Sequence, residues 1–401
     1  MLRAMPAPLL SIGLSLGAAL VAAPSAIFTT EVLASYLPRR KAPRALPTRD
    51  FRMAVLVPAH DEAAGIEATV RHLLAELGPE DRLVVIADNC SDDTATLARE
   101  AGAEVLERRD AERRGKGYAL SYGAEHLTTD PPNVVVVMDA DCRVARGSLR
   151  GLALEALASG RPTQAVYLLE RPAGNNDLSG ISAFAFLVRN LVRPRGLRRL
   201  GLPCELTGTG MAFPWPVYRD APATHGFLAE DRLLGHELAL RGAPPLLDED
   251  TLVVGELAQN APASFKQRRR WEHGGLAILF GTSPRLLVQG LLRADLGLIA
   301  QGLDSAVPPL ALLVLLQSGA ALGTAGVALV GGPVLPFAVA AGGCAVLGAG
   351  VLLAWLVDGR QLLPPAEVLR IPRYVLWKLP LYASFARHGA HGEWERTDRS
   401  A

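Results

Sequence analysis

The chain has 401 residues, of which 50% are hydrophobic and 20% charged, and its formal net charge at pH 7 is +1. This length suits one large catalytic domain with a few membrane helices, and the hydrophobic share is high for a soluble protein. The near-zero net charge creates no overall field that attracts nucleic acid, so we expect no nucleic-acid partner. The four cysteines have no CxxC spacing, which argues against a zinc site or a disulfide framework and favours reduced, cytosolic thiols.

An uncharged segment from Ala4 to Thr30 is long enough to cross the hydrocarbon core of a bilayer as one helix. The strongest basic run nearby, Arg39–Lys41, follows this segment, and cationic flanks stay on the cytoplasmic side. We therefore predict an N-terminal transmembrane helix within residues 1–37 and a cytosolic domain after it. The alternative is a secretory signal peptide, because Ala22–Ala26 resembles a cleavage site.

Residues 51–275 form the predicted soluble domain, in which short apolar runs rich in β-branched residues alternate with helical patterns. This alternation predicts an α/β fold with a mostly parallel sheet and helices on both faces. Ligands of such sheets bind at the carboxyl ends of the strands, and acidic residues follow three of the predicted strands. The predicted strands are 53–57, 83–87, 103–106 and 134–138, and the predicted helices are 65–77 and 94–101.

Acidic side chains directly after predicted strands are the first candidates for chemistry. Asp139 and Asp141 follow a run of valines, and two carboxylates there can hold a hard cation that neutralises a diphosphate. Glu62 and Asp88 stand after two other strands, where a carboxylate can accept a hydrogen bond from a base or a ribose. The alternatives are a solvated loop for the first pair of aspartates and helix capping for Asp92–Asp93.

Three more candidate groups lie later in the domain. Lys116, between two glycines before a helical pattern, could contact phosphate together with backbone amides. Asp231, next to Glu230 at the start of an amphipathic pattern, is a candidate general base; the alternative is an acidic first turn favoured by the helix dipole. Arg270 has the donor geometry for phosphate oxygens, and Trp271 offers a face to a sugar ring; the alternative is a basic, aromatic belt at a membrane interface.

Residues 305–357 carry no charge and predict two further transmembrane helices that turn near Gly331–Pro333. One long buried core segment is the alternative. We expect residues 276–304 to form interfacial helices and residues 358–401 to form a cytosolic, amphipathic C-terminal segment at the membrane surface. About three spans then place the large domain and the C-terminus on the same, cytosolic side.

In their order along the chain, these motifs resemble those of the membrane-bound, inverting family 2 glycosyltransferases, the group that contains the cellulose, chitin and hyaluronan synthases. The resemblance covers residues 51–271, and the series DxD, ED and QxxRW is specific although its single members are not. One departure is Asp61, which stands where Asn is usual. The motifs are Pro58–Glu62, Asp88–Asp93, Gly115–Gly117, Asp139–Asp141, Glu230–Asp231 and Gln267–Trp271.

This resemblance implies a GT-A fold, a nucleotide-sugar donor that is usually a UDP-sugar, and a Mg²⁺ or Mn²⁺ cofactor. It assigns catalysis to Asp231 and Glu230, and the metal to Asp139 and Asp141. The residues that it assigns to substrate binding are Glu62, Asp88, Lys116, Asp139, Gly208, Gly210, Gln267, Arg270 and Trp271.

The expected enzyme is a multi-pass protein of the inner (plasma) membrane with a cytoplasmic catalytic domain. It would move a sugar to a growing polysaccharide or a lipid-linked acceptor in one in-line displacement, which inverts the anomer and gives a β-linkage. Since polysaccharide synthases with their own export channel carry more spans, we expect a homo-oligomer, an export partner, or the addition of a single sugar to a lipid. A third alternative is a nucleotide-sugar-binding scaffold without turnover, against which the intact Asp141, Asp231 and Arg270 argue.

Overall fold

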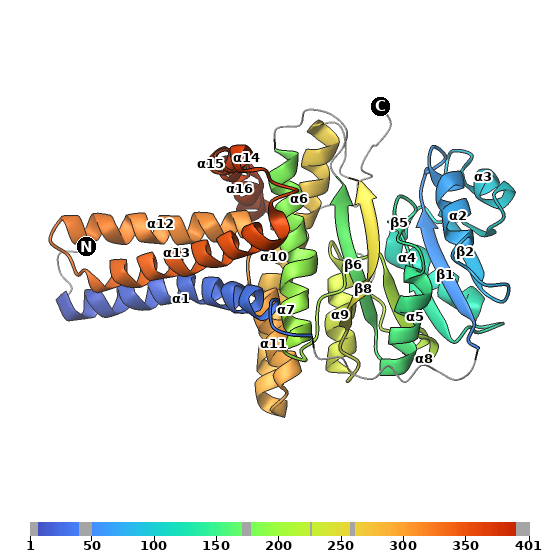
Figure 1. Cartoon of the computed structure of the whole chain (residues 1–401), viewed down its shortest axis with the longest axis horizontal. Coiled ribbons are helices and arrows are strands. Elements are labelled where there is room, and N and C mark those ends of the chain that lie inside the picture. Colours follow the sequence, from blue (N-terminus) through green and yellow to red (C-terminus); the bar gives the residue numbers. More distant parts are fainter. Residues whose placement is uncertain (1–6, 40–49, 171–177, 225–226, 257–260, 390–401) are drawn as a thin grey trace.

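A mixed sheet forms the centre of the domain in this structure, a computed structural model that describes residues 7–39, 50–170, 178–224, 227–256 and 261–389. Among these residues the sheet has eight strands in the order β3-β2-β1-β4-β7-β6-β8-β5 (Figure 1). The strands are β1 (Met53–Ala59), β2 (Arg82–Asp88), β3 (Glu104–Arg108), β4 (Val134–Val137), β5 (Arg143–Val144), β6 (Thr163–Glu170), β7 (Met211–Pro214) and β8 (Leu246–Glu256).

The first half of the sheet is parallel, as the alternation of strands and helices predicts. Strand β1 pairs in parallel with β2 and β4, and β2 pairs in parallel with β3. The predicted strands and helices of this half are confirmed to within a few residues. The carboxyl ends of β1, β2 and β4 therefore meet at one edge of the sheet.

The second half of the sheet departs from the parallel arrangement. Strand β7 is antiparallel to both β4 and β6, and β5 is antiparallel to β8, whereas β6 and β8 are parallel. The α/β class is confirmed, but the sheet is mixed because β7 inserts between the two parallel groups in the opposite direction.

Helices cover both faces of the sheet. Val55 and Val57 face a core shared with α2, α3 and α5, whereas Ala54 and Leu56 face a core shared with α4, α8 and α9. This alternation follows from the two-residue period of a strand. The helices are α2 (Ile66–Leu74), α3 (Thr94–Glu100), α4 (Lys116–Leu127), α5 (Ser148–Ser159), α6 (Ser179–Leu187), α7 (Arg193–Arg199), α8 (Trp215–Arg219) and α9 (Glu230–Leu240), with a π-helical turn η2 (Val188–Val192) after α6.

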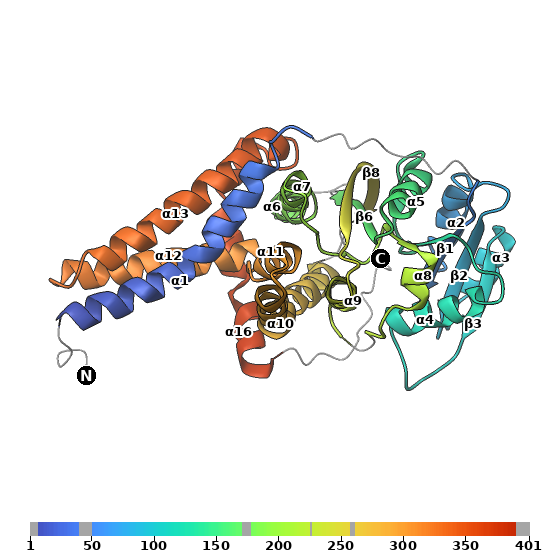
Figure 2. The same cartoon turned by 90° about the horizontal axis from the view of Figure 1, so that it is seen from below.

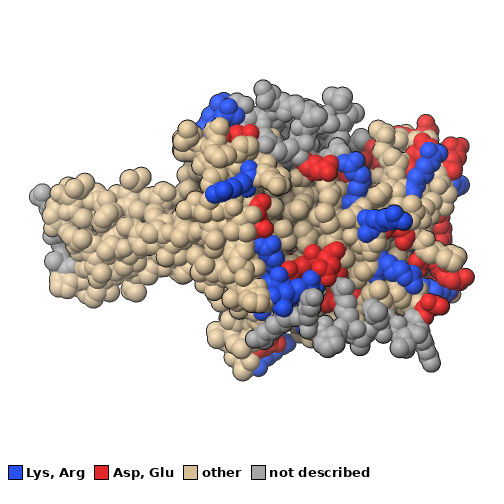
Figure 3. Space-filling model, in the orientation of Figure 1, with Lys and Arg blue, Asp and Glu red and all other residues tan. Residues whose placement is uncertain are grey.

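Three long apolar helices form a bundle that projects from the domain: α1 (Ala7–Ala34), α12 (Leu310–Leu329) and α13 (Leu335–Ala354), which ends in a π-helical turn η3 (Trp355–Gly359) (Figures 1 and 2). In the view of Figure 3 its surface carries no Lys, Arg, Asp or Glu, and charged residues begin where the bundle meets the domain. By length and composition, α1, α12 and α13 with η3 could each cross a membrane.

Two helices run across the base of this bundle rather than along it: α10 (Ala261–Arg293) and α11 (Leu296–Ser305) (Figures 1 and 2). The segment Gln267–Arg293 of α10 is a fourth helix of sufficient length and apolarity to cross a membrane, against about three predicted spans. It overlaps the segment predicted as interfacial. The last described helices are α14 (Pro365–Val368), α15 (Ile371–Trp377) and α16 (Leu379–His388).

Polar contacts and small residues join α1 to the rest of the molecule. Arg193 of α7 donates to Glu31 (2.5 Å) of α1 and to Asp304 (2.5 Å) of α11, and all three side chains are largely buried. A side chain at Gly196 would overlap the Glu31 carbonyl, so the α1 and α7 backbones are in contact there. In the bundle, Thr29 Oγ1 donates to a carbonyl of α13, 2.9 Å away. The N-terminal helix is thus packed into the folded molecule, the arrangement expected of the predicted transmembrane helix.

Candidate active site

A cavity of about 1510 Å³ lies at the carboxyl ends of β1, β2 and β4. One side, the strand-end wall, carries residues that follow these strands, and the opposite side, the helical wall, carries residues of α9, α10 and α16. The strand-end wall is formed by Glu62, Asp88, Asp139 and Asp141, and the helical wall by Glu230, Asp231, Arg269, Arg270, Trp271, Ser384 and His388. A cavity at this edge of the sheet is where α/β proteins bind their ligands.

Asp88 ends β2 and is held by its neighbours on one side only. Arg108 lies directly beside it in the register of β3 and donates to Oδ1 (2.6 Å), and the Asn89 amide donates to the same oxygen (3.0 Å). Asp88 lines the cavity, and among the described residues no hydrogen bond reaches its second carboxylate oxygen, Oδ2. One oxygen is therefore left for a ligand, which suits the predicted contact with a nucleotide.

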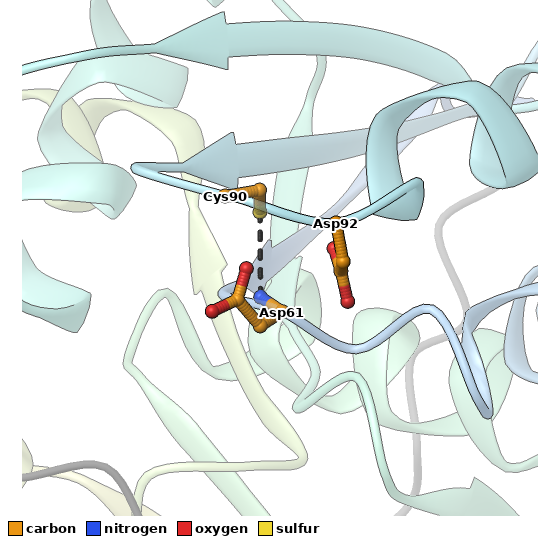
Figure 4. A group of neighbouring side chains, drawn as sticks. All are labelled: Asp61, Cys90 and Asp92. Atoms are coloured by element: carbon orange, nitrogen blue, oxygen red, sulfur yellow. Dashed lines mark hydrogen bonds between the residues drawn. The ribbon is translucent and has the colours of Figure 1, made fainter.

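The loops after β1 and β2 are tied together by Asp61, Cys90 and Asp92 (Figure 4). Asp61 has a positive φ of 52° and accepts a hydrogen bond from the backbone of Ser91 (2.6 Å), while its own amide donates to the Cys90 sulfur (3.4 Å). Asp92 accepts from the backbone of Ala63 (3.1 Å). Although ligand atoms of these three residues lie within 4.8 Å of one another, both carboxylates are engaged with backbone amides. We assign them to holding the loops that present Glu62 and Asp88 to the cavity.

Asp139 and Asp141 form a better cation site. Their carboxylates and the Cys142 sulfur lie within 4.8 Å of one another, and the two aspartates line the cavity. Burial raises the pKa of Cys142 to about 12, so it remains a neutral thiol. The donors available to an ion are thus the two carboxylates, of which Asp139 also pairs with Lys116, a set that fits Mg²⁺ or Mn²⁺ and lies on the cavity wall beside space for a ligand.

Lys116 joins the two walls. It opens α4 directly after Gly115, whose φ of 127° suits glycine, and its ammonium group pairs with Asp139 and donates to the Gly208 carbonyl (2.6 Å). Burial alone would lower the pKa of Lys116, but Asp139 and Asp231, with further acidic neighbours, raise it, so the group is charged. A fixed positive charge at the centre of an acidic cavity is positioned to meet the phosphates of a ligand.

Asp231 and Glu230 begin α9 and face this lysine. A side chain at Gly208 would lie 3.3 Å from the Asp231 carboxylate, and Glu230 accepts a hydrogen bond from the Gly117 amide (3.1 Å). Burial raises the pKa of Asp231, and Lys116 offsets part of this effect; burial also raises the pKa of Glu230 to about 7. A carboxylate whose pKa is raised toward neutrality is suited to accept a proton.

Behind α9 lies a buried polar cluster that the sequence did not indicate. Glu205 pairs with Arg232, accepts from Ser305 of α11, and contacts His236 (2.8 Å), whose other ring nitrogen contacts Thr282 (2.8 Å) of α10. These contacts give His236 a structural role. The cluster fixes α9 against α10 and α11. No local signal marks Glu205, because its partners are distant in sequence.

The QxxRW motif lies in the first half of α10, and its residues face different ways. Arg270 and Trp271 line the cavity, and the Trp271 ring also packs against Phe186 of α6, with the ring centroids 5.4 Å apart. Gln267 is buried and does not line the cavity, and its side-chain oxygen has no hydrogen-bond partner among the described residues. Arg268 stacks over Trp377 of α15, 5.4 Å from the ring centroid. The Gln267 side chain thus lies behind the cavity wall, and its contact with substrate stays a prediction.

Gly208 and Gly210 also have different surroundings. Gly208 lines the cavity beside Asp231 and Lys116. A side chain at Gly210 would instead lie 2.7 Å from Val253 of β8, inside the sheet core. Packing between strands alone thus accounts for the small size of Gly210, and its contact with an acceptor stays a prediction.

The end of α16 is a second feature that sequence reasoning missed. Ser384 and His388 line the cavity close to the QxxRW motif. The amphipathic pattern of the C-terminal segment predicts a position at a membrane surface and no part in a site. It gives no sign of this contact, because amphipathicity does not identify what covers the apolar face.

Comparisons with known proteins show which family models and structures this chain resembles. A family model described as glycosyl transferase family group 2 matches residues 134–356, more than half of the chain, and one described as glycosyl transferase family 2 matches residues 54–183. No curated protein matches. The structure is similar to that of a mannosyltransferase from Pyrobaculum calidifontis, solved with GDP-Man and Mn²⁺, at 19% identity and a TM-score of 0.53, over 91% of this chain and 99% of that one.

A second similar structure is glucosyl-3-phosphoglycerate synthase from Mycobacterium tuberculosis, solved with Mn²⁺, UDP and phosphoglyceric acid. It is 21% identical over 57% of this chain and 78% of that one, with a TM-score of 0.39. The likeness to the archaeal mannosyltransferase extends over nearly the whole chain and confirms the predicted GT-A class of fold, a sheet with flanking helices together with long apolar helices.

Proposed function

Because this chain belongs to glycosyl transferase family 2, we propose that it transfers a sugar from a nucleotide-sugar donor to an acceptor at a membrane surface. The observation that carries the proposal is the convergence of four kinds of group in one cavity. They are a carboxylate pair (Asp139 and Asp141), a half-buried ammonium group (Lys116), a half-buried carboxylate (Asp231) and a guanidinium group (Arg270). Transfer of a sugar from a nucleoside diphosphate needs groups that neutralise charge, act as a base and bind the leaving group.

The donor fits the strand-end wall. The free oxygen of Asp88 and the carboxylate of Glu62 are placed to bind the nucleoside, and Lys116 and Arg270 to bind the diphosphate from two sides. Asp139 and Asp141 would hold Mg²⁺ or Mn²⁺, which supplies positive charge to the leaving diphosphate when bound. A UDP-sugar is the first donor to test. The mannosyltransferase of similar fold was solved with GDP-Man, which makes a GDP-sugar the second.

Asp231 acts as the general base in this proposal. It takes the proton of the acceptor hydroxyl, whose oxygen attacks the anomeric carbon from the side opposite the diphosphate. Lys116 and Arg270 stabilise the negative charge that develops on the leaving group. One displacement inverts the anomer, so an α-linked donor gives a β-linkage. Glu230 holds the start of α4 through the Gly117 amide and keeps Lys116 in place.

The apolar helices support a membrane location. We propose that α1, α12 and α13 span the inner membrane and that α10 and α11, which cross the base of their bundle, lie in the cytoplasmic interface. Helices α10 and α11 carry large exposed apolar side chains that suit a position in the membrane interface, among them Phe280, Leu291, Leu292 and Leu296. Arg270 and Trp271 on the same helix then place the cavity next to lipid headgroups, which suits a polysaccharide or lipid-linked acceptor.

The packing of the bundle favours the addition of a single sugar to a lipid-linked acceptor as the second candidate. Gly343 of α13 is so close to Gln317 of α12 and Ala22 of α1 that a side chain there would overlap both. At this level the three helices leave no room for a polymer to pass between them. A polymer-forming enzyme, related to the cellulose, chitin and hyaluronan synthases, would therefore need a homo-oligomer or a separate export partner.

The test uses purified protein in detergent or lipid nanodiscs with Mg²⁺ or Mn²⁺ and a panel of radiolabelled UDP- and GDP-sugars. Products are sized on a gel and extracted into organic solvent. A long water-soluble product indicates a polymerase, and a short solvent-extractable product indicates a lipid glycosyltransferase. Nucleotide binding without any transfer to membrane lipids or glycans would contradict the proposal and favour a nucleotide-sugar-binding scaffold.

A further inference from the structure

The C-terminal helices α15 and α16 pack along the part of α10 that carries the QxxRW motif. Their contacts begin with Phe265 and Arg268, whose side chains meet the Trp377 ring at 5.6 and 5.4 Å. They continue with Glu272 and His273, the two residues directly after the motif. The C-terminal segment therefore covers the face of α10 that carries Arg268 and Glu272, which do not line the cavity, and reaches His273, which does.

The central contact is a buried ion pair between Glu272 of α10 and Lys378, which precedes α16. The side chains are only 10% and 6% exposed. Tyr382 donates its hydroxyl hydrogen to the second oxygen of Glu272 (3.1 Å), and the Lys378 ammonium lies 4.9 Å from the centroid of the Tyr374 ring. Each oxygen of Glu272 thus has its own partner, so the carboxylate is fixed in both position and orientation.

His273 adds a second attachment one residue later. Its Nε2 contacts the Leu381 carbonyl of α16 at 3.0 Å, and its ring meets Phe385 edge-on at 5.4 Å. Two consecutive residues of α10, pointing about 100° apart around the helix, are therefore held by the same C-terminal segment. Such a pair of attachments fixes the rotation of a helix about its own axis.

The rotation of α10 about its own axis determines the direction in which the side chains of the QxxRW motif point. Arg268 and Glu272 are four residues apart and share a face, and this face contacts α15 and α16. Arg270 and Trp271 turn instead toward the cavity. A rotation by a fraction of a turn would move the guanidinium group by several ångströms, and a misplacement of about 1 Å can cost a hundredfold in rate.

We propose that the pair of Glu272 and Lys378 is a positioning device that sets Arg270 against the diphosphate of the donor, so that the C-terminal helices are part of the catalytic apparatus. The inference rests on the proposed function for the identity of the donor. The end of α16 reaches the cavity itself through Ser384 and His388, which places the same segment at the rim on the side of the helical wall.

The experiment compares Glu272→Gln and Lys378→Met with a matched buried ion pair outside the site. Arg199 and Glu249 form that pair, with side chains 13% and 10% exposed, and neither residue lines the cavity. Breaking either pair should lower the melting temperature, because each leaves one buried charge without its partner. Glu249→Gln is therefore the control for a loss of stability alone.

The first readout is affinity for nucleotides, measured by calorimetry with UDP and UMP, and with GDP and GMP. In the proposed site, Arg270 binds the diphosphate of the nucleotide and does not contact its nucleoside. We expect Glu272→Gln and Lys378→Met to weaken diphosphate binding about tenfold, as Arg270→Ala does, with the monophosphate affinity unchanged. Lys378→Arg should retain most of the diphosphate affinity. Glu249→Gln should leave both affinities as in the wild type.

The second readout is sugar transfer, for which kcat should fall at least about tenfold in Glu272→Gln and stay unchanged in Glu249→Gln. Equal behaviour of these two variants in both readouts would overturn the proposal and leave the pair a purely structural one. Should Glu272→Gln fail to fold, Tyr382→Phe removes one hydrogen bond to the carboxylate and should produce the same pattern at smaller amplitude. If the wild-type protein binds UDP or GDP but transfers no sugar, the proposed function fails. The proposal about Glu272 and Lys378 is still tested in that case, because diphosphate binding can be compared between the variants.

Discussion

The two walls of the cavity are built by different means. In the strand-end wall, Asp88 and Asp139 directly follow buried strands, and the register of the parallel sheet brings them to one edge. In the helical wall, Asp231 and Arg270 depend on contacts between segments about a hundred residues apart, such as Ser305 with Glu205 and Lys378 with Glu272. The first wall is therefore specified locally, whereas the second exists only after the helices have packed.

The largest loss of sugar transfer is expected from a substitution in the helical wall, at the proposed base Asp231. Asp231→Asn removes the proton acceptor but keeps size and hydrogen bonding, so transfer should fall by about 10³- to 10⁴-fold. Nucleotide binding should persist, because the strand-end wall is intact. Parallel measurement of kcat and of UDP or GDP affinity tests this, with Asn89→Ala as a comparison on the opposite wall. Transfer at the wild-type rate in Asp231→Asn would refute the assignment of the base.

The next largest effect is expected in the strand-end wall, at the carboxylate pair. Asp141→Asn halves the charge offered to a divalent ion, and transfer should fall by about 10²- to 10³-fold. Removal of Mg²⁺ and Mn²⁺ by a chelator should stop transfer, and either ion should restore it. In contrast to Asp231→Asn, excess Mn²⁺ should partly rescue this variant. Undiminished transfer in the chelator would show that Asp139 and Asp141 serve a different purpose.

A smaller effect is expected on the pH profile. The base must be ionised, and burial raises the pKa of Asp231, so transfer should rise with pH along a limb that lies above that of an ordinary aspartate. Burial raises the pKa of Glu230 to about 7, and its charge disfavours ionisation of its neighbour. Glu230→Gln removes that charge and should shift the acid limb of kcat to lower pH. A shift to higher pH would contradict this account of the two carboxylates.

The smallest effect on transfer is expected from a substitution at Gly210. Comparison with the same substitution at Gly208 tests whether the two glycines have different roles. Gly210→Ala forces a methyl group against Val253, and the positive φ of 63° adds strain, so unfolding should become easier by about 1–3 kcal/mol. Because Gly208 borders Asp231 and Lys116, Gly208→Ala should instead lower kcat or raise the acceptor KM. Melting curves and kinetics on both variants separate the two roles. A loss of transfer without loss of stability in Gly210→Ala would show that Gly210 is a site residue.

Sequence patterns are sufficient to predict the strand-end wall. A buried parallel strand fixes the edge of the sheet at which the next residue lies, so the pattern alone places Glu62, Asp88, Asp139 and Asp141 together, as the cavity confirms. The mixed character of the sheet is not predictable in the same way. The short strand β7 has no alternation of its own and is defined by its pairing with β4 and β6.

The helical wall is predictable only in part. The motifs indicate Asp231, Arg270 and Trp271, but a motif does not show which face of a helix each residue occupies, so the burial of the Gln267 side chain is not predictable from it. Glu205 and Lys378 escape prediction as members of the site, because buried charges are recognised by their partners and not by their neighbours in sequence.

The contacts of α1 have a consequence for the order in which the protein assembles during synthesis. Ser25 and Thr29 are made well before their partners Gln317 and Val346, which lie about 300 residues later in the chain. The parallel strands, with pairings of short sequence separation, can form long before α13 leaves the ribosome, since local contacts form first. Helix α1 therefore completes its packing only after α12 and α13 have been made. The helical wall needs the residues after α13 and forms later still, so the strand-end wall can exist in the nascent chain before the helical wall.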